Sequence, residues 1–384
     1  MATAVPNHGS HLAHVFAQYP LEVVRAHGCW LEGRDGQRVV DFYGGHAVAA
    51  LGYGHSRWIE ALEGQARSVQ FQTNAIPMAV RERAAERLVA FAGLGLDQVF
   101  FVNSGAEANE NALRTAFRLT GRRQAIALEQ GWHGRTAAAG AVTFGARDKW
   151  YGFPQTPFDV QWISRTDPAG ALAINHDTAC VIVEPIQGLA GAFEVPTDVL
   201  RALRARCTEV GALLIFDEVQ CGVGRTGYPF GANRVSVTPD MLTTAKALGA
   251  GFPVSALLMS PHVAGALKIE DMGTTFGGGP LACAIVETVI DIIESEGLLE
   301  NVKKMSALIQ SSCVGGVVSG VQGAGLLLGL KTTRPAKAIQ AELLARGIFV
   351  GTAADPHIIR LLPPFTIGQD HVALLAQALQ ELTP

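Results

Sequence analysis

The sequence of 384 residues predicts an α/β fold, in which a large domain with a mostly parallel sheet is joined to a smaller α+β domain. Two observations predict the large domain: several segments are apolar throughout, as buried strands are, and helical patterns alternate with them. A third observation predicts the smaller domain, because the chain changes character from about residue 280 onward. The length is sufficient for two domains with a large buried core.

Strand and helix candidates of the large domain follow one another as in βαβ units. A strand over 98–104 leads into a helix over 106–119, and a strand over 179–186 precedes a helix from about 198 to 210. The next strand covers 212–217. The polar residues of interest follow the carboxyl ends of these strands, which is where ligands bind in open α/β sheets.

The remainder of the chain predicts a different arrangement. A long helix over 281–295 is followed by short strands near 324–330 and 358–362. We therefore expect three parts: an N-terminal segment over 1–55 that packs with the small domain, a large domain over 56–277 and a C-terminal small domain over 278–384.

The composition is that of an ordinary globular protein, with 48% hydrophobic and 17% charged residues. A net charge of −4 gives no indication of nucleic acid or anionic lipid as partner. No apolar run reaches ~18 residues, and the N-terminus lacks the features of a signal peptide. We therefore expect a cytoplasmic protein without a membrane span. The six cysteines show no metal-ligand spacing, so we expect reduced thiols and no metal site.

One lysine and one aspartate stand out. The chain has seven lysines, hence 30 − 7 = 23 arginines, and Lys246 alone lies among apolar residues and glycines. Asp217 lies 246 − 217 = 29 positions earlier and closes an apolar run. A buried amine and a buried acid cost several kcal/mol unless they are compensated. Pyridoxal phosphate would compensate both, because the lysine forms an imine with its aldehyde and the aspartate holds its ring nitrogen protonated. A strand-end aspartate can equally be a helix cap.

A second motif suits a phosphate group. Ser104 with Glu107 three residues later is a capping box at the start of a helix, and Gly105 lets the backbone approach a ligand closely. The free N–H groups of a helix N-terminus bind phosphate well. Capping boxes are common without any ligand, and no Walker lysine follows this one.

Aromatic and cationic residues complete the set of candidates. Trp132 offers a face for stacking on a planar ring, and Arg135 offers a fork for a carboxylate. Arg360 interrupts an apolar strand, so it needs an anionic partner, either a structural carboxylate or a substrate. Each of these residues, and each hydroxyl of the loop 273–280, also has an ordinary structural interpretation.

Together and in this order, the motifs resemble those of class III pyridoxal-phosphate aminotransferases, specifically the acetylornithine and ornithine aminotransferase branch. The resemblance runs from Trp30-Leu-Glu-Gly-Arg-Asp-Gly to Arg360-Leu-Leu-Pro-Pro, and its core is Asp217-Glu-Val-Gln with Lys246-Ala-Leu-Gly-Ala-Gly-Phe-Pro. It implies a fold type I transferase with a mostly parallel seven-stranded sheet. It also implies pyridoxal 5'-phosphate as cofactor and a homodimer with shared active sites.

The resemblance assigns roles to residues around the cofactor. Lys246 binds it covalently and moves the proton, and Asp217 pairs with the ring nitrogen. The other cofactor-binding residues implied are Ser104, Gly105 and Ala106 at the phosphate, Trp132 stacked on the ring, Gln220 at the phenolic oxygen, Glu184, and Thr275 reaching the phosphate from the other subunit.

The same resemblance implies two half-reactions, in which an amino donor gives its nitrogen to the cofactor and 2-oxoglutarate then collects it as glutamate. Arg360 would bind the α-carboxylate of 2-oxoglutarate, and Arg135 the distal carboxylate or the carboxylate of an acylated diamino acid. Gly45 stands where ornithine aminotransferases tend to carry a tyrosine, which favours N-acetylornithine as donor. Tyr19 is also expected at the substrate site.

Three positions depart from the pattern of the relatives. Many of them have a glutamate where this chain has Leu189, and that glutamate pairs with the arginine matched by Arg360 while an ω-amine binds. Its absence predicts an available Arg360, a wider donor range and another group that compensates the arginine. Gly279 and Met272 replace an asparagine and a histidine near the expected contact between subunits, and we expect them only to loosen that loop.

Other functions remain open. The donor is alternatively ornithine, 4-aminobutyrate or a broader set of amines. An aminomutase, racemase or decarboxylase would use the same lysine and aspartate, and a cofactor-binding regulatory module would not turn over at all. Arg135 and Arg360 together favour a dicarboxylate acceptor and hence transamination, and no basic helix-turn-helix segment accompanies them.

Overall fold

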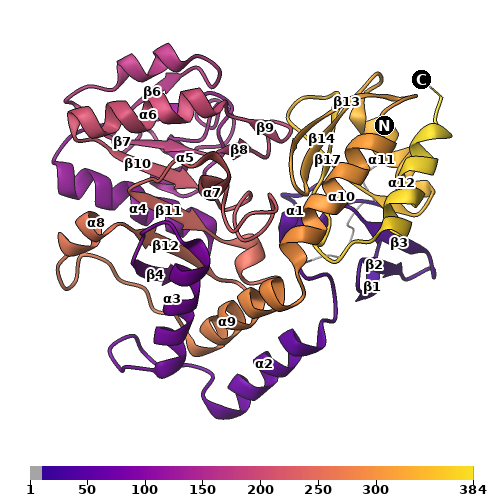
Figure 1. The fold of residues 1–384 in the computed structure, drawn as a ribbon, viewed down its shortest axis with the longest axis horizontal. Helices are drawn as coiled ribbons and strands as arrows, with labels where there is room; N and C mark the ends of the chain where they lie inside the picture. Colours follow the sequence, from indigo (N-terminus) through magenta and orange to yellow (C-terminus); the bar gives the residue numbers. More distant parts are fainter. Residues whose placement is uncertain (1–10, 384) are drawn as a thin grey trace.

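The computed structural model describes residues 11–383, which form two lobes (Figure 1). The larger lobe is built on a seven-stranded sheet, in which six strands run in one direction and β12 runs opposite to both of its neighbours. The expected mostly parallel seven-stranded sheet is thereby confirmed. Its strands, in spatial order, are β4 (Gln98–Val102), β12 (Ser255–Met259), β11 (Met241–Thr244), β10 (Leu213–Asp217), β7 (Thr178–Val183), β5 (Gln124–Leu128) and β6 (Asp159–Ile163).

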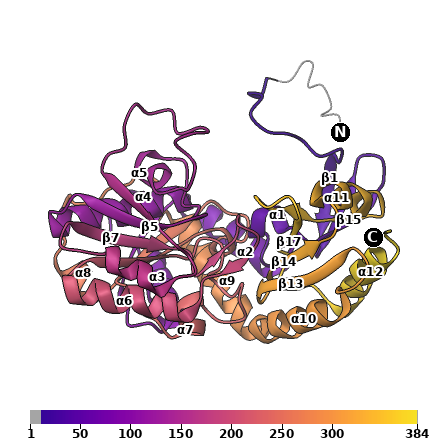
Figure 2. The same cartoon turned by 90° about the horizontal axis from the view of Figure 1, so that it is seen from above.

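Helices cover both faces of this sheet (Figure 2). Alternate side chains of β7 divide between two cores, since Ile182 packs with α4 and Val183 with α6. This burial on both faces explains why the strands are apolar throughout. The helices and helical turns of this lobe are α2 (Ser56–Ser68), α3 (Ala79–Ala92), α4 (Gly105–Thr120), α5 (Ala137–Ala141), η1 (Pro168–Ala173), α6 (Thr197–Val210), α7 (Gly231–Val235), η2 (Lys246–Leu248), α8 (Pro261–Gly265) and α9 (Pro280–Ser295).

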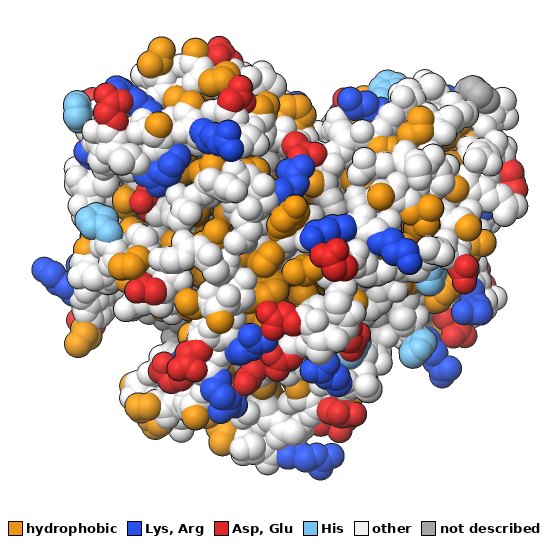
Figure 3. Space-filling model, in the orientation of Figure 1, with side chains coloured by type: hydrophobic (Ala, Val, Ile, Leu, Met, Phe, Trp, Pro, Cys, Tyr) orange, Lys and Arg blue, Asp and Glu red, His pale blue; other side chains and the backbone are white. Residues whose placement is uncertain are grey.

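Helix α9 is the long helix predicted after residue 280, and it packs against α2 and α3 of the larger lobe. Exposed ion pairs such as Arg83–Glu287 and Arg87–Asp291 join α3 to α9. Figure 3 shows charges of both signs interspersed over this part of the surface, rather than an area of one sign.

The smaller lobe contains two four-stranded sheets. In the first, β3 near the N-terminus pairs in parallel with β15, so the N-terminal strands share a sheet with the C-terminal part of the chain. The strands are β1 (Val23–His27), β2 (Trp30–Gly33), β3 (Arg38–Asp41) and β15 (Ile348–Phe349) in one sheet, and β13 (Val318–Ala324), β14 (Leu327–Thr332), β17 (Ile358–Leu361) and β16 (Gly351–Thr352) in the other. The helices are α1 (Gly44–Ala47), α10 (Leu298–Ser312), α11 (Ala336–Ala345) and α12 (Gln369–Gln380).

The strand expected near 324–330 is β14, and it forms a hairpin with β13, which was not predicted. Strands β13 and β14 meet at Gly325, whose φ of 56° lies in the left-handed region that favours glycine. A Cβ on Gly325 would lie 2.4 Å from the carbonyl oxygen of Arg225, so close packing also requires the glycine here. The other predicted helices and strands agree with the structure to within a few residues at their ends.

No helix within residues 11–383 has both the length and the apolar character needed to cross a bilayer. In the same range, no group of three or more histidine, cysteine, aspartate or glutamate side chains is arranged to hold a metal ion. All six cysteines are free and buried.

Candidate functional site

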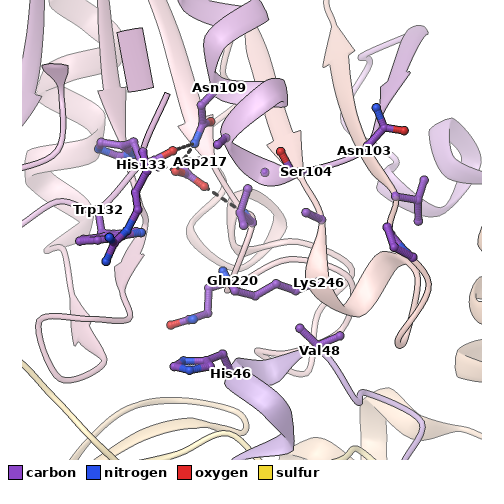
Figure 4. Close-up of a pocket in the computed structure, with 18 of the residues that line it drawn as sticks. His46, Val48, Asn103, Ser104, Asn109, Trp132, His133, Asp217, Gln220 and Lys246 are labelled. Atoms are coloured by element: carbon purple, nitrogen blue, oxygen red, sulfur yellow. Dashed lines mark hydrogen bonds and ion pairs between the residues drawn. The ribbon is translucent and has the colours of Figure 1, made fainter. Parts of the chain in front are cut away.

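A cavity of about 800 Å³ lies where the carboxyl ends of the large sheet meet the smaller lobe (Figure 4). Eleven of the fourteen predicted site residues line it, and the other three do not. The eleven are Ser104, Gly105, Ala106, Trp132, Arg135, Glu184, Leu189, Asp217, Gln220, Lys246 and Arg360.

Asp217 ends strand β10 and is 3% exposed. One carboxylate oxygen accepts hydrogen bonds from Asn109 Nδ2 at 2.7 Å and lies 2.8 Å from His133 Nδ1, and the other accepts from the Val219 N–H at 3.0 Å. Neither lysine nor arginine is paired with this carboxylate among the described residues. It is therefore a fixed, buried carboxylate that can pair with a cationic group in the cavity.

Lys246 follows strand β11, next to β10 in the sheet, and its side chain reaches into the cavity toward Gln220 (Figure 4). Its φ of 44° places it in the left-handed region, which is uncommon for a residue with a side chain. Burial lowers the pKa of the Lys246 amine, while Asp217 and Glu184 act in the opposite direction. A lowered pKa leaves more of the amine unprotonated near neutral pH, and only the unprotonated amine can act as a nucleophile or accept a proton.

The N-terminus of helix α4 forms part of the cavity wall through Ser104 and the two residues that follow it. Ser104 is the N-cap, and its Oγ accepts from the Glu107 N–H at 3.2 Å. The Glu107 carboxylate reaches back one residue further than a capping box requires, to the Asn103 N–H at 2.7 Å. Gly105 is needed for packing within the protein, because a Cβ there would lie 2.6 Å from the Val219 side chain.

Trp132 and Arg135 stand together at the cavity wall. The Arg135 guanidinium carbon lies 5.4 Å from the centre of the Trp132 ring and 4.9 Å from that of Trp150. Arg135 makes no hydrogen bond or ion pair within residues 11–383, so its charge is free to meet an anion. Glu184 fixes this segment by accepting the Trp132 N–H at 2.8 Å, and burial raises the pKa of Glu184 to about 7.

Arg360, on β17, is 3% exposed and is held by neutral oxygens alone. Its Nε donates to the Thr352 carbonyl at 2.8 Å, Nη1 to the Gly188 carbonyl at 3.4 Å and Nη2 to the Tyr43 hydroxyl at 2.7 Å. These three oxygens are the compensation that the sequence predicted in the absence of a glutamate at Leu189. None of them carries a charge, so the arginine keeps its positive charge toward the cavity.

The three predicted residues outside the cavity are Tyr19, Gly45 and Thr275. Tyr19 packs edge-on against Phe349, with ring centres 4.9 Å apart. Gly45 is exposed beside His46, and His46 lines the cavity instead. Thr275 is exposed on the loop before α9. The roles expected of these three residues remain predictions.

Sequence reasoning missed three residues that position the predicted ones, and also His46, which lines the cavity. Asn109 and His133 hold Asp217, while Tyr43 holds Arg360 and contacts His46. Asn109 lies on α4 four positions after Gly105, one helical turn on. Residues four positions apart share a helix face, so the sequence could have predicted that Asn109 faces the cavity as Gly105 does. Tyr43 contacts His46, three positions away, and Arg360, 317 positions away. A contact over 317 positions leaves no repeating pattern in the sequence from which it could be predicted.

The cavity fits pyridoxal phosphate on three observations. It contains an amine able to meet an aldehyde, a buried carboxylate able to meet a ring nitrogen, and a helix N-terminus able to meet a phosphate. His133 Nε2 and Gln220 Oε1 are buried at this site without a hydrogen-bond partner among the described residues. Buried polar atoms are nearly always satisfied, so a bound polar group is expected beside them.

Comparison with known proteins agrees with this geometry. The family model of class III aminotransferases matches residues 12–382. An acetylornithine aminotransferase of Streptomyces coelicolor is 42% identical over 369 residues, which cover 94% of this chain and 90% of the relative. An acetylornithine aminotransferase of Mesorhizobium japonicum is 38% identical over 388 residues, with 95% and 94% covered.

Solved structures show the same fold. An ornithine aminotransferase from Toxoplasma gondii superposes with a TM-score of 0.89 at 26% identity, covering 97% of this chain and 91% of that chain. A PLP-bound amine transaminase from an uncultivated Pseudomonas species gives 0.87 at 27% identity, covering 97% and 96%. The chain therefore belongs to the class III aminotransferases and is a pyridoxal-phosphate-dependent transaminase.

Proposed function

We propose that this transaminase moves the ω-amino group of N-acetylornithine, or of a similarly acylated diamino acid, to 2-oxoglutarate, giving the semialdehyde and glutamate. The observation that carries the proposal is the meeting of Lys246 and Asp217 with two arginines, Arg135 and Arg360, around one cavity. The names of the relatives from Streptomyces coelicolor and Mesorhizobium japonicum support the choice of donor.

Lys246 and Asp217 carry the chemistry in this proposal. When bound, pyridoxal phosphate supplies an aldehyde that captures the amine and an electron sink for the carbon that loses a proton. Lys246 holds the cofactor and then takes and returns that proton, for which its lowered pKa is suited. Asp217 holds the ring nitrogen, and the hydrogen bonds from Asn109 and His133 keep its carboxylate in place.

Binding of the other cofactor groups follows from the cavity wall. Ser104, Gly105 and Ala106 offer the helix N-terminus to the phosphate, and Trp132 offers a ring for stacking. Gln220, which lines the cavity, would bind the phenolic oxygen, and Glu184 would keep the Trp132 segment in place through the hydrogen bond from the Trp132 N–H.

Two arginines with free charge suit a dicarboxylate such as 2-oxoglutarate. Arg360 receives its α-carboxylate, and Arg135 receives its distal carboxylate or the carboxylate of the acylated donor. Both guanidinium groups lack a carboxylate partner among the described residues, so neither must give one up when the substrate arrives. Tyr19 and Gly45 are proposed to shape the same substrate site from just outside it.

Leu189 supports a second candidate, a transaminase with a wider donor range that includes ornithine, 4-aminobutyrate and α-amino acids. With Leu189 in place Arg360 remains free to bind a donor's α-carboxylate, so α-amines compete with ω-amines. We expect Leu189→Glu to raise the ratio of kcat/KM for ω- over α-amino donors by about tenfold or more, equivalent to about 1.4 kcal/mol. Leu189→Gln matches the size without the charge and should leave the ratio near that of the wild type. If the glutamate also leaves it unchanged, Leu189 is only a wall of the pocket.

We further propose a homodimer with shared active sites, to which Thr275 contributes from the other subunit. An exposed apolar cluster around Thr275 supports this: Phe276 is 67% exposed, Ile76 47% and Phe71 44%. Such clusters on a surface mark interfaces.

Light scattering should give twice the mass of the chain. Phe276→Glu should lower the measured mass to that of the monomer and weaken retention of the cofactor. Leu172→Glu, at a side chain 77% exposed in η1, is the control that should remain dimeric.

The division of the chain and its location are also proposals. The pairing of β3 with β15 supports an N-terminal segment over 1–55 that packs with a small domain over 278–384. The large cofactor-binding domain then covers 56–277. Within the small-domain range, α9 packs against α2 and α3 of the larger lobe and so links the two domains. We place the enzyme in the cytoplasm, with small-molecule substrates and no nucleic acid or membrane partner.

A further inference from the structure

Arg360, Tyr43 and His46 form a chain of hydrogen bonds that ends at the cavity. Arg360 Nη2 lies 2.7 Å from the Tyr43 hydroxyl, and this hydroxyl lies 2.8 Å from His46 Nδ1. Tyr43 is 3% exposed and its ring packs edge-on against Phe349.

Hydrogen-bond chemistry allows one continuous direction along this chain. A guanidinium only donates, so the Tyr43 hydroxyl accepts from Arg360 and keeps its own proton available for His46 Nδ1, 2.8 Å away; this is the direction taken here. Nδ1 is then an acceptor, and the ring is neutral with its proton on Nε2. Although His46 is exposed overall, its partial burial at the cavity, followed by the charges of Arg360 and Lys246, lowers the pKa of its ring, which agrees with a neutral imidazole.

The backbone holds His46 in an unusual way. Residues 44, 45, 46 and 47 all have positive φ, of 54°, 55°, 64° and 70°, so α1 is a left-handed turn. Glycine adopts this conformation freely, but His46 and Ala47 do so at a cost. Strain of this kind persists mainly at functional sites. Here it places the His46 ring at the cavity wall below Gln220 and Lys246 (Figure 4).

We infer that His46 is a specificity-determining residue whose Nε2–H donates a hydrogen bond to an acceptor oxygen of the amino donor. Tyr43 is the positioning residue that fixes this tautomer and orients Arg360. The inference rests on the proposed function and names the feature of the donor that is recognised, an acyl carbonyl or a carboxylate oxygen.

This arrangement gives a physical reason for preferring an acylated diamino acid. Arg360 and His46 present only donors and positive charge to this part of the cavity. With its carboxylate on Arg135, ornithine would bring a free α-ammonium group close to that guanidinium, and turned toward His46 this ammonium would meet a donor instead of an acceptor, which disfavours it. Acylation converts that ammonium into a neutral amide, whose carbonyl oxygen accepts a hydrogen bond.

Two substitutions of His46 separate its two ring nitrogens. His46→Asn keeps an acceptor near Nδ1 for Tyr43 and loses the donor near Nε2, and asparagine tolerates the left-handed backbone. His46→Gln keeps an amide N–H near the Nε2 position. We expect the asparagine variant to raise KM for N-acetylornithine by about threefold to tenfold while KM for ornithine changes little. The glutamine variant should retain most of the preference.

Tyr43→Phe keeps the ring packing and removes the hydroxyl. We expect it to raise KM for both N-acetylornithine and 2-oxoglutarate by about threefold to tenfold, with the absorbance of the bound cofactor unchanged. A merely structural role would change kcat, cofactor content and thermal stability instead.

The outcomes are distinguishable. If the wild type prefers N-acetylornithine and both His46 variants keep the ratio of the two donors within about twofold, this inference is overturned and the proposed function stands. The inference is equally overturned if the asparagine and glutamine variants behave alike. A wild type that uses ornithine as well as its acylated form overturns both the inference and the proposed function.

Discussion

Asp217 owes its position to residues that are distant in the sequence. Asn109 and His133, which hold its carboxylate, lie 108 and 84 positions away, and Thr243 in turn donates to Asn109 Oδ1 at 2.6 Å. The sequence identified Asp217 and Lys246 because charged residues are rare at the ends of apolar runs. It did not identify their partners, because a buried polar contact between distant elements leaves no local pattern.

The bond from Thr243 gives a test of this network. We expect Thr243→Val to lower the free energy of unfolding by about 1–3 kcal/mol, because Asn109 Oδ1 would be buried without a donor. Urea unfolding of the cofactor-loaded protein measures it. Thr244→Val is the matched control, since the Thr244 hydroxyl is buried without a partner among the described residues. Thr244→Val should leave the free energy of unfolding unchanged. If both variants lower it equally, the hydrogen bond from Thr243 to Asn109 has no special role in stability.

Apolar runs and helix caps predicted the positions of the main strands and helices of the large lobe to within a few residues. Helix α4 begins at the Ser104 cap and is followed by Gly121 in the left-handed conformation, as sequence signals for helix ends require. Of the hairpin β13–β14, only β14 was predicted. Strand β13 carries polar or glycine residues, among them Gly320, Gln322 and Gly323, and so lacks the apolar run that marks β14, while its turn at Gly325 is fixed by close packing against Arg225.

Glu218 links the loop after β10 to helix α7. Its carboxylate accepts from the Gly231 N–H at 2.5 Å and the Ala232 N–H at 2.7 Å, and burial raises the pKa of Glu218 to about 7. In the unfolded chain the Glu218 carboxyl has its ordinary pKa. At any pH between that pKa and the raised pKa of the folded state, the folded protein therefore binds more protons than the unfolded one. Stability therefore falls as pH rises through this window, and the fall is complete above the folded pKa.

Glu218→Gln removes this titration. From about pH 5 to pH 8, we expect the wild type to lose about 3 kcal/mol of unfolding free energy relative to the variant. Glu184, whose pKa is also raised, is present in both proteins and cancels from the difference. Chemical denaturation at several pH values measures it. If the unfolding free energies of the wild type and Glu218→Gln change in parallel across this pH range, the pKa of Glu218 is not raised by folding.

At the scale of the whole molecule, Arg225 joins segments from three parts of the chain. This fully buried guanidinium donates to the carbonyls of Leu326 at 3.2 Å, Pro363 at 2.5 Å and Ala47 at 3.3 Å. It also lies over the Phe365 ring at 4.5 Å. The larger lobe is thereby fixed to the smaller one beside the cavity.

Lysine cannot replace this fork, because one ammonium group does not reach three separate carbonyls. We expect Arg225→Lys to lower the free energy of unfolding by roughly 2–4 kcal/mol, measured by urea denaturation. Arg57→Lys, at a side chain 42% exposed, is the control and should change it by less than about 0.5 kcal/mol. A loss at Arg225 no larger than that of the control would mean that the lobes are held together without it.

The central claim is that the cavity holds pyridoxal phosphate on Lys246 and takes the ω-amine of an acylated diamino acid. The most direct measurement is the visible absorption of the purified protein while N-acetylornithine, ornithine, 4-aminobutyrate and glutamate are added one at a time. We expect N-acetylornithine to abolish the cofactor band far faster than ornithine does, and 2-oxoglutarate to restore it. A protein without a visible band would contradict the cofactor site, and equal rates with ornithine or 4-aminobutyrate would contradict the donor.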